Sequence, residues 1–256
     1  MSGALRVALG EYDTGWHDPA TSLARAGTLV ADAARQGARL VVLPEMCTTG
    51  FTMDTAWAEP VEGGSVQALA ALARAHGVHL IAGVSLREPT PAGERAFNTA
   101  LVFGPDGALS GMYRKQRLFA YAGEHESFAA GGVPLTCAIE GLRVSPFVCY
   151  DLRFPELFRE VARDTDAIVV IANWPVTRRE HWLALLRARA IENQCWVVGV
   201  NRTGEAHGLT YRGDSVVFDP WGEQVAAAGG EGVTCADLDP GRVAEIRERF
   251  PFLRDR

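Results

Sequence analysis

Apolar runs of strand type alternate with helix-type stretches along nearly the whole chain of 256 residues. This alternation is typical of α/β proteins, in which helices cover the faces of a β-sheet. No Ser/Pro-rich linker and no repeat interrupts the pattern. We therefore expect a single α/β domain over residues 1–256.

Turn and capping residues mark the expected elements of the first half. Asp18 and Pro19 open a helix, because an aspartate caps free backbone N–H groups and a proline suits the first helical turn. Gly77 closes a second helix. The expected elements are a strand at Leu5–Glu11, the helix from Asp18, a strand at 38–46, a helix at 65–76, a strand at 79–86 and two strands around a turn at 104–107.

The second half repeats this logic and adds a hairpin. The expected elements are a strand at 142–150, a helix from Pro155, a strand at 167–174, a helix at 179–193, a strand at 195–202, a hairpin at 214–229 with its turn at 219–222, a strand at 233–239 and a last helix capped by Asp239 and Pro240. Hairpins among crossover connections predict mixed sheets rather than purely parallel ones.

Composition excludes several classes of function. The net charge is −6 and the arginines are dispersed, which argues against nucleic acid as a partner. No apolar run approaches the roughly 18 residues of a membrane-spanning helix, and the N-terminus lacks the pattern of a signal peptide, so we expect a cytoplasmic protein without a membrane partner. The five cysteines are scattered and the histidines have no metal-ligand spacing, so neither a disulfide framework nor a metal site is indicated. A small-molecule substrate is the expected partner.

Lysine occurs once. Of the 25 basic residues 24 are arginines, and the remaining one is Lys115, directly after the second strand of the expected pair around 104–107. Chance or a surface lysine would explain the count. The sharper interpretation is that position 115 requires a compact ammonium group, which a planar guanidinium cannot replace.

Two further residues follow apolar strands. Cys149 ends a strand shortly before the helix from Pro155, where turn and helix-terminal N–H groups favour a thiolate and an oxyanion. Glu45 follows the apolar run of 40–43 and a proline, at the carboxyl end of a strand, where active sites of α/β proteins collect. A buried core cysteine and an ordinary exposed or salt-bridged glutamate are the alternatives. Together with Lys115, these residues would supply a nucleophile, a base and an oxyanion donor for acyl transfer.

The segments LPEM, YRKQRLF and FVCYDLRFPE occur in this order and resemble the three signatures of the nitrilase or carbon-nitrogen hydrolase superfamily. Downstream stretches extend the resemblance over about residues 5–250, and the ω-amidase branch is the most similar. The resemblance implies a four-layer α-β-β-α sandwich of two mixed sheets. It also implies a Glu-Lys-Cys triad of Glu45, Lys115 and Cys149, with no metal or organic cofactor.

The resemblance implies further site residues. A second active-site glutamate falls on Glu124, with Glu126 as its rival and a solvated loop acid as the alternative for both. The backbone N–H of Tyr150 is expected to join Lys115 in the oxyanion hole. Asn173 and Trp174 end a strand and are expected to bind substrate, although a capping asparagine and a core tryptophan would fit the same positions.

Other polar residues near these segments receive structural interpretations. Arg153 could bind a substrate carboxylate, but we expect an ion pair that holds the turn after Cys149. Arg187, Arg189 and Glu192 are expected to form salt bridges on a packed helix. A papain-like pair of Cys149 with His125 would leave Lys115 and Glu45 without a role.

The resemblance implies a cysteine-dependent amidase that forms a thioester, with 2-oxoglutaramate as the first substrate to consider. The alternatives are another C–N substrate for the same triad (deaminated glutathione, an N-carbamoyl compound or a nitrile) and a non-catalytic binding protein on this scaffold. Tyr150 and Asp151 stand where true nitrilases commonly have Trp-Glu, which disfavours a nitrile. The resemblance also implies a homodimer or larger assembly, in which the C-terminal segment 247–256 could cross the interface or cover its own core.

Overall fold

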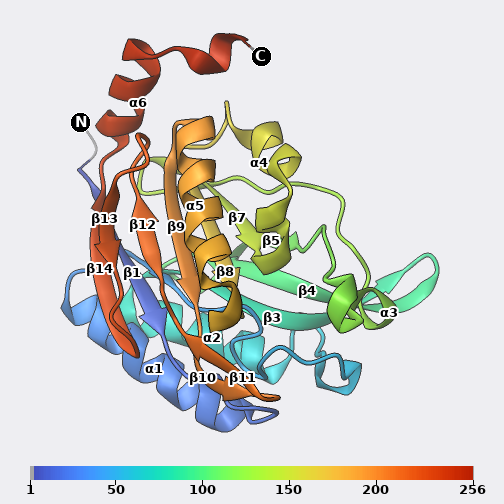
Figure 1. Cartoon of the computed structure of the whole chain (residues 1–256). Coiled ribbons are helices and arrows are strands. Elements are labelled where there is room, and N and C mark those ends of the chain that lie inside the picture. Colours follow the sequence, from blue (N-terminus) through green and yellow to red (C-terminus); the bar gives the residue numbers. More distant parts are fainter. Residues whose placement is uncertain (1–2, 256) are drawn as a thin grey trace.

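Two mixed sheets form the centre of the computed structural model, which describes residues 3–255 (Figure 1). Residues 1, 2 and 256, at the ends of the expected domain and of the C-terminal segment, lie outside the described residues. The first sheet has the strand order β14-β1-β2-β3-β4-β5 and consists of β1 (Leu5–Glu11), β2 (Leu40–Val42), β3 (His79–Thr90), β4 (Gly93–Phe103), β5 (Leu109–Arg114) and β14 (Gly232–Leu238). The second has the order β13-β12-β9-β8-β7-β6 and consists of β6 (Cys137–Ile139), β7 (Leu142–Val148), β8 (Ala167–Ala172), β9 (Trp196–Asn201), β12 (Val216–Phe218) and β13 (Gln224–Ala227).

Both sheets are parallel at the centre and antiparallel at the sides. In the first sheet β2 pairs in parallel with β1 and β3, and in the second sheet β8 pairs in parallel with β7 and β9. The outer pairs are antiparallel. The prediction of mixed sheets is therefore confirmed.

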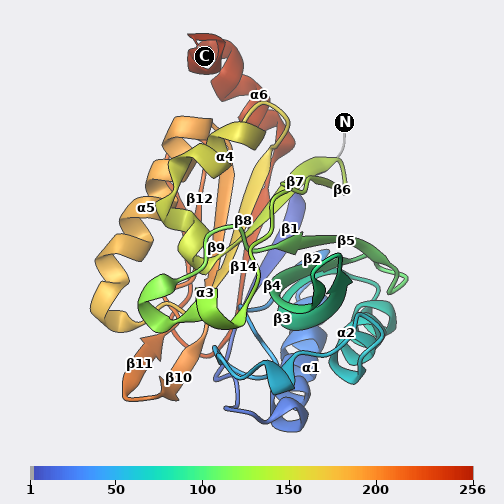
Figure 2. The same ribbon diagram turned by 90° about the vertical axis from the view of Figure 1, so that its right-hand side faces the viewer.

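The outer faces of the two sheets are covered by α1 (Pro19–Arg35), α2 (Gly64–His76), α4 (Pro155–Val161) and α5 (Arg179–Asn193) (Figure 2). The short α3 (Glu124–Ser127) lies at the side of the sandwich, and α6 (Pro240–Arg249) extends beyond its end (Figure 1). Figure 2 shows α4 and α5 on one side, α1 and α2 on the other, and the sheets between them. This arrangement confirms the expected four-layer α-β-β-α sandwich. Among residues 3–255, no helix combines the length and the apolar character needed to cross a membrane.

Strand periodicity assigns the residues of β1 to two different clusters of the core. Val7 and Leu9 of β1 face the second sheet and belong to the cluster between the sheets, whereas Ala8 belongs to the cluster beneath α1 and α2. Side chains alternate between the faces of a strand, so a strand with apolar residues on both faces serves both clusters. This double burial explains why the central strands read as continuous apolar runs.

The capping residues act as the sequence predicts. The side chain of Asp18 accepts from the backbone N–H of Thr21 at 3.0 Å, and that of Asp239 accepts from Gly241 at 2.8 Å. Gly77 ends α2 at a φ of 61°, in the left-handed region that glycine adopts without a steric penalty. The turn at 219–222 closes the β12–β13 hairpin, with Gly222 donating to the Asp219 carbonyl at 2.8 Å.

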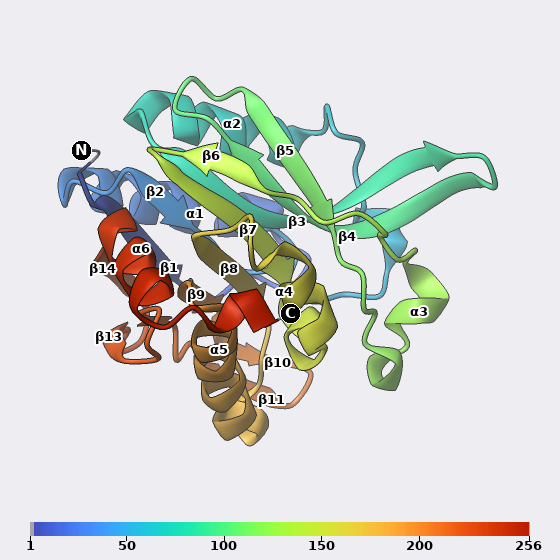
Figure 3. The same ribbon diagram turned by 90° about the horizontal axis from the view of Figure 1, so that it is seen from above.

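Several elements differ from the expectation. β3 continues to Thr90 and forms a long hairpin with β4 that projects from the body (Figure 3). An unexpected hairpin of β10 (Thr203–Ala206) and β11 (Leu209–Arg212) forms a separate two-stranded sheet. The short β6 and α3 were also not expected. The remaining elements are 3-10 helices, η1 (Thr55–Trp57), η2 (Ala120–Ala122), η3 (Cys149–Arg153), η4 (Val176–Arg178) and η5 (Phe252–Asp255).

Candidate active site

Strand ends from both sheets bring the predicted residues together. Lys115 directly follows β5, Cys149 directly follows β7, and Asn173 directly follows β8, while Glu45 lies three residues beyond β2. The carboxyl ends of strands in α/β proteins carry loops rather than sheet hydrogen bonds, so side chains there are free to form a site.

Lys115 lies between two carboxylates in the interior. Its Nζ atom donates to Oε1 of Glu45 at 3.0 Å and to both carboxylate oxygens of Glu124 at 3.0 and 2.9 Å. All three side chains are fully buried. Burial disfavours the charge on Lys115, but attraction to Glu45 and Glu124 outweighs it and raises the pKa of Lys115. Lys115 is therefore a permanent cation.

Two asparagines fix the carboxylates. Nδ2 of Asn98 donates to Oε1 of Glu45 at 2.7 Å and to Oε1 of Glu124 at 2.9 Å. Asn173 donates from its backbone N–H to Oε2 of Glu45 at 2.8 Å and from Nδ2 to the Glu45 carbonyl at 2.7 Å. The backbone N–H of Phe119 donates to Oε2 of Glu124 at 2.6 Å. These bonds hold both carboxylates rigidly around the ammonium group.

Cys149 occupies a strained turn beside this cluster. Its φ is 48°, in the left-handed region that non-glycine residues seldom adopt, and it is the first residue of η3. Burial and repulsion by Glu45 raise its pKa, and Lys115 opposes them only in part. The resting side chain is therefore a thiol, which needs a base to become a nucleophile. Glu45 is the carboxylate whose charge Cys149 senses most strongly.

Asp151 joins the turn of Cys149 to the loop after Lys115. Its Oδ1 accepts from the backbone N–H groups of Gln116 at 3.2 Å and Arg117 at 2.8 Å. Its Oδ2 accepts from the backbone of Val148 and from the hydroxyl of Tyr113, both at 3.0 Å. Burial raises its pKa to about 6, although these donors favour the charged form.

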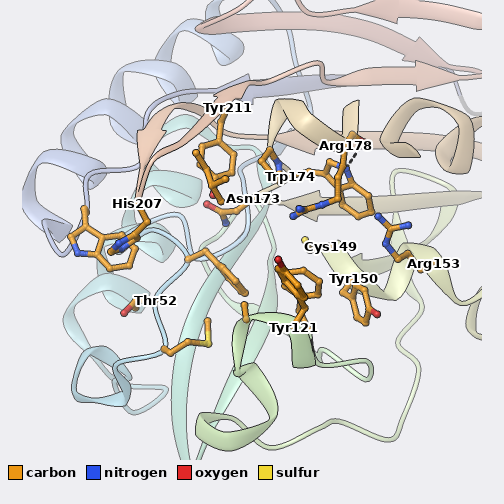
Figure 4. Close-up of a pocket in the computed structure, with 17 residues that line it drawn as sticks. Thr52, Tyr121, Cys149, Tyr150, Arg153, Asn173, Trp174, Arg178, His207 and Tyr211 are labelled. Atoms are coloured by element: carbon orange, nitrogen blue, oxygen red, sulfur yellow. Dashed lines mark hydrogen bonds between the residues drawn. The ribbon is translucent and has the colours of Figure 1, made fainter. Parts of the chain in front are cut away.

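Cys149 opens onto a pocket of about 500 Å³ (Figure 4). Asn173 and Trp174 line it, as does Tyr150. The lining is mainly apolar and aromatic, and its other members are Trp16, Phe51, Thr52, Met53, Phe119, Tyr121, Ala122, Arg153, Pro175, Arg178, His207, Leu209 and Tyr211. A concave, mostly apolar cavity with a few polar groups is the usual form of a small-molecule site. Within residues 3–255, no group of three or more His, Cys, Asp or Glu side chains is arranged to hold a metal ion.

The structure separates the competing loop residues. Glu124 contacts Lys115, whereas Glu126 is exposed and lies 3.9 Å from His125. His125 is also exposed and does not line the pocket, so no papain-like pair with Cys149 forms.

The structure also distinguishes between the ion pairs predicted for Arg189 and Arg153. Arg189 forms the expected salt bridge with Glu192 at 2.8 Å. The ion pair expected for Arg153 does not form in the described part of the chain, because this side chain lies over the ring of Trp174 at 4.8 Å and donates to His181 at 3.2 Å.

Asn98 and Arg178 had no role predicted from the sequence, and Asp151 was noted there only as a difference from nitrilases. Asn98 is a polar residue inside the apolar run of β4, and this interruption was a usable signal. Asp151 stands two residues after Cys149, where a buried carboxylate can accept from a turn. Arg178 carries no signal among so many arginines, since only the folded chain shows that it lines the pocket.

Known proteins resemble the chain over nearly its whole length. The carbon-nitrogen hydrolase family model matches residues 6–248. The omega-amidase YafV of Escherichia coli K12 is 40% identical over 222 residues, which cover 86% of this chain and 84% of that protein. The 2-oxoglutaramate amidase of Bacillus subtilis is 34% identical over 252 residues, which cover 96% of this chain and 95% of that one.

A solved structure supports the same relationship. XC1258 from Xanthomonas campestris, described as a CN-hydrolase superfamily protein with an arsenic adduct in its active site, superposes with a TM-score of 0.92 at 39% identity and covers 99% of this chain and 97% of its own. With the family model and the two amidases, this match shows that the chain belongs to the carbon-nitrogen hydrolase family.

Proposed function

We propose that this protein is an ω-amidase that hydrolyses the terminal amide of 2-oxoglutaramate to a carboxylate and ammonia. The names of two relatives, omega-amidase and 2-oxoglutaramate amidase, support the reaction and the substrate. The observation that carries the proposal is the buried Glu45–Lys115–Glu124 cluster beside Cys149, at the base of a pocket without a carboxylate of its own.

The first half of the reaction forms a thioester. Glu45 accepts the Cys149 proton as sulfur attacks the amide carbon, and the carbonyl electrons move onto oxygen. The ammonium group of Lys115, held by Glu45 and by both oxygens of Glu124, stabilises the oxyanion through its positive charge, together with the backbone N–H of Tyr150. When the tetrahedral intermediate collapses, the C–N bond breaks and the nitrogen takes the proton from Glu45. Ammonia then leaves.

The second half reverses these roles with water. Glu45 takes a proton from water as its oxygen attacks the thioester carbon, and Glu124 keeps Lys115 in position for the second oxyanion. The C–S bond then breaks, the acid is released, and Cys149 regains its proton from Glu45. Asn173 and Trp174 form the wall along which the acyl chain lies.

The test measures ammonia release from 2-oxoglutaramate, with glutamine, deaminated glutathione and a simple nitrile as comparison substrates. Wild-type protein is expected to turn over the keto amide selectively, and Cys149→Ala is expected to remove turnover while the circular dichroism spectrum is unchanged. Turnover that survives in Cys149→Ala would refute the role of the cysteine. Turnover of one of the other substrates alone would refute 2-oxoglutaramate as the substrate and leave the proposed catalytic triad unaffected.

An amide with a larger leaving amine is the second candidate, and the size of the pocket favours it. A five-carbon keto amide fills only part of a cavity of about 500 Å³. Deaminated glutathione, which also carries carboxylates, would occupy more of the apolar wall. The ratio of kcat/KM for the two substrates decides between them.

Exposed apolar side chains near the C-terminal segment bear on the oligomeric state. We infer a homodimer because apolar side chains are exposed beside a small depression near the C-terminal segment, with Ile191 at 50%, Trp221 at 43% and Phe252 at 56% exposure. Light scattering before and after truncation at Phe250 tests this interface.

A cytoplasmic location fits the five free cysteines, because Cys149 must stay reduced to react.

A further inference from the structure

The charged side chains that line the pocket are all basic. Arg153 and Arg178 contribute guanidinium groups, and no Asp or Glu belongs to the lining. Behind the pocket, two carboxylates and one ammonium group leave the buried cluster with a net negative charge. An anionic substrate that approaches Cys149 is therefore repelled by the cluster unless a cation in the wall compensates.

Arg178 is anchored by its backbone and has no acidic partner in the described part of the chain. Its N–H donates to the Pro175 carbonyl at 3.0 Å, and its own carbonyl accepts from Nε1 of Trp174 at 2.8 Å. The guanidinium lies 5.5 Å from the ring centroid of Phe119. By contrast, the adjacent Arg179 pairs with Asp214 at 2.7 Å and with Glu180 at 2.9 Å.

Arg153 is more strongly engaged than Arg178. Its guanidinium lies 4.8 Å from the ring centroid of Trp174, and Nη2 donates to Nδ1 of His181 at 3.2 Å. Figure 4 shows Arg178 extending from η4 towards the interior of the pocket, while Arg153 lies beside Tyr150. Arg178 is thus the cation with more free N–H donors.

We propose that Arg178 determines specificity by binding the carboxylate of the substrate, while the amide at the other end of the molecule lies at Cys149. This inference rests on the proposed amidase function. A guanidinium presents a planar fork that matches a carboxylate with two parallel hydrogen bonds. Phe119, Trp174 and Tyr211 line the same pocket, and such apolar surroundings strengthen a charge pair.

The kinetic test compares an anionic and a neutral amide in Arg178→Gln. A hydrogen-bonded charge pair is expected to be lost, so kcat/KM for 2-oxoglutaramate should fall about 10- to 100-fold, mainly through KM. Turnover of pentanamide, which has no carboxylate, should change less than about twofold, and Arg178→Lys should recover part of the loss because it keeps the charge without the fork. Arg212→Gln is the matched control, since Arg212 is an exposed arginine of β11 that does not line the pocket.

A binding measurement keeps the inference separate from the amidase proposal. The dissociation constant of 2-oxoglutarate is measured on Cys149→Ala with and without Arg178→Gln, where no turnover is needed. If Arg178→Gln weakens the binding of 2-oxoglutarate by about tenfold or more, the role of Arg178 is supported. This result holds even if the wild type does not hydrolyse 2-oxoglutaramate, since that failure would refute only the proposed substrate. Equal losses for the two amides, or unchanged binding of 2-oxoglutarate, would overturn the role of Arg178.

Discussion

Replacing Glu11 by glutamine is expected to stabilise the protein increasingly as the pH rises from 5 to 8. Glu11 is the last residue of β1 and is fully buried. Its Oε1 accepts from the backbone N–H of Ser215 at 2.6 Å, whereas Oε2 has no hydrogen-bond partner within residues 3–255. Burial raises the pKa of Glu11 from 4.5 to about 7, and the nearby charge of Asp214 adds to the effect.

The direction of the pH dependence follows from the raised pKa. Between pH 4.5 and 7 the folded chain keeps a proton on Glu11 that the unfolded chain has lost. The stability contributed by this proton is complete below pH 4.5 and is lost as the pH rises through 7. The gap between 4.5 and about 7 corresponds to about 3 kcal/mol, since each pKa unit is worth about 1.4 kcal/mol. Between pH 5 and 8 the expected change is about 2–3 kcal/mol.

The assay is urea unfolding of wild type and Glu11→Gln at pH 5, 6, 7 and 8. Glutamine cannot titrate, so the free energy of unfolding of the variant should rise relative to wild type by about 2–3 kcal/mol from pH 5 to 8. Any change in hydrogen bonding is the same at each pH and cancels in this comparison. Glu160→Gln, at an exposed position of α4, serves as the control. A difference between Glu11→Gln and wild type that is constant across the pH range would refute the reasoning.

Two further substitutions test how the backbone positions the site. Asp151→Asn places an amide NH₂ opposite two of the four donors that now face the carboxylate. The melting temperature, measured by differential scanning calorimetry, should fall by roughly 5–10 °C, and kcat in the ammonia assay should fall as well. An unchanged kcat would contradict a role of Asp151 in aligning Cys149 with Lys115. Gly83→Ala introduces a Cβ only 2.6 Å from Cα of Glu45, so it should destabilise the protein by about 1–3 kcal/mol and lower activity. The control is Gly64→Ala, whose Cβ meets no atom within 4 Å and which should leave activity unchanged. Equal behaviour of the two alanine variants in urea unfolding and turnover would exclude the predicted clash.

The order of the elements could be predicted because burial and capping leave local signals. The central strands are apolar on both faces, and Asp18, Gly77 and Asp239 mark helix ends through their own backbone contacts. The β10–β11 hairpin escaped detection because it belongs to neither large sheet and most of its residues are not buried. It turns through His207 and Gly208, which both have positive φ, and this turn places His207 in the pocket wall.

The site could be predicted where chemistry restricts the residue type. Lys115 stood out as the only lysine, and Glu45 and Cys149 stood at strand ends. The resemblance placed the second glutamate at Glu124 with Glu126 as its rival. Both lie in the same short helix, and packing in the folded chain buries Glu124. The role of Arg178 depends on which arginines find carboxylates in the folded chain, and such pairings are tertiary.

The burial of the only lysine has a practical consequence for protein chemistry. A lysine-specific protease has one bond to cut in this sequence, between residues 115 and 116. In the folded chain this lysine is inaccessible, so reagents that modify amines cannot reach its side chain. Cleavage into two fragments therefore occurs only when the loop after β5 opens. Loss of the intact band on a gel then reports the opening of this one region.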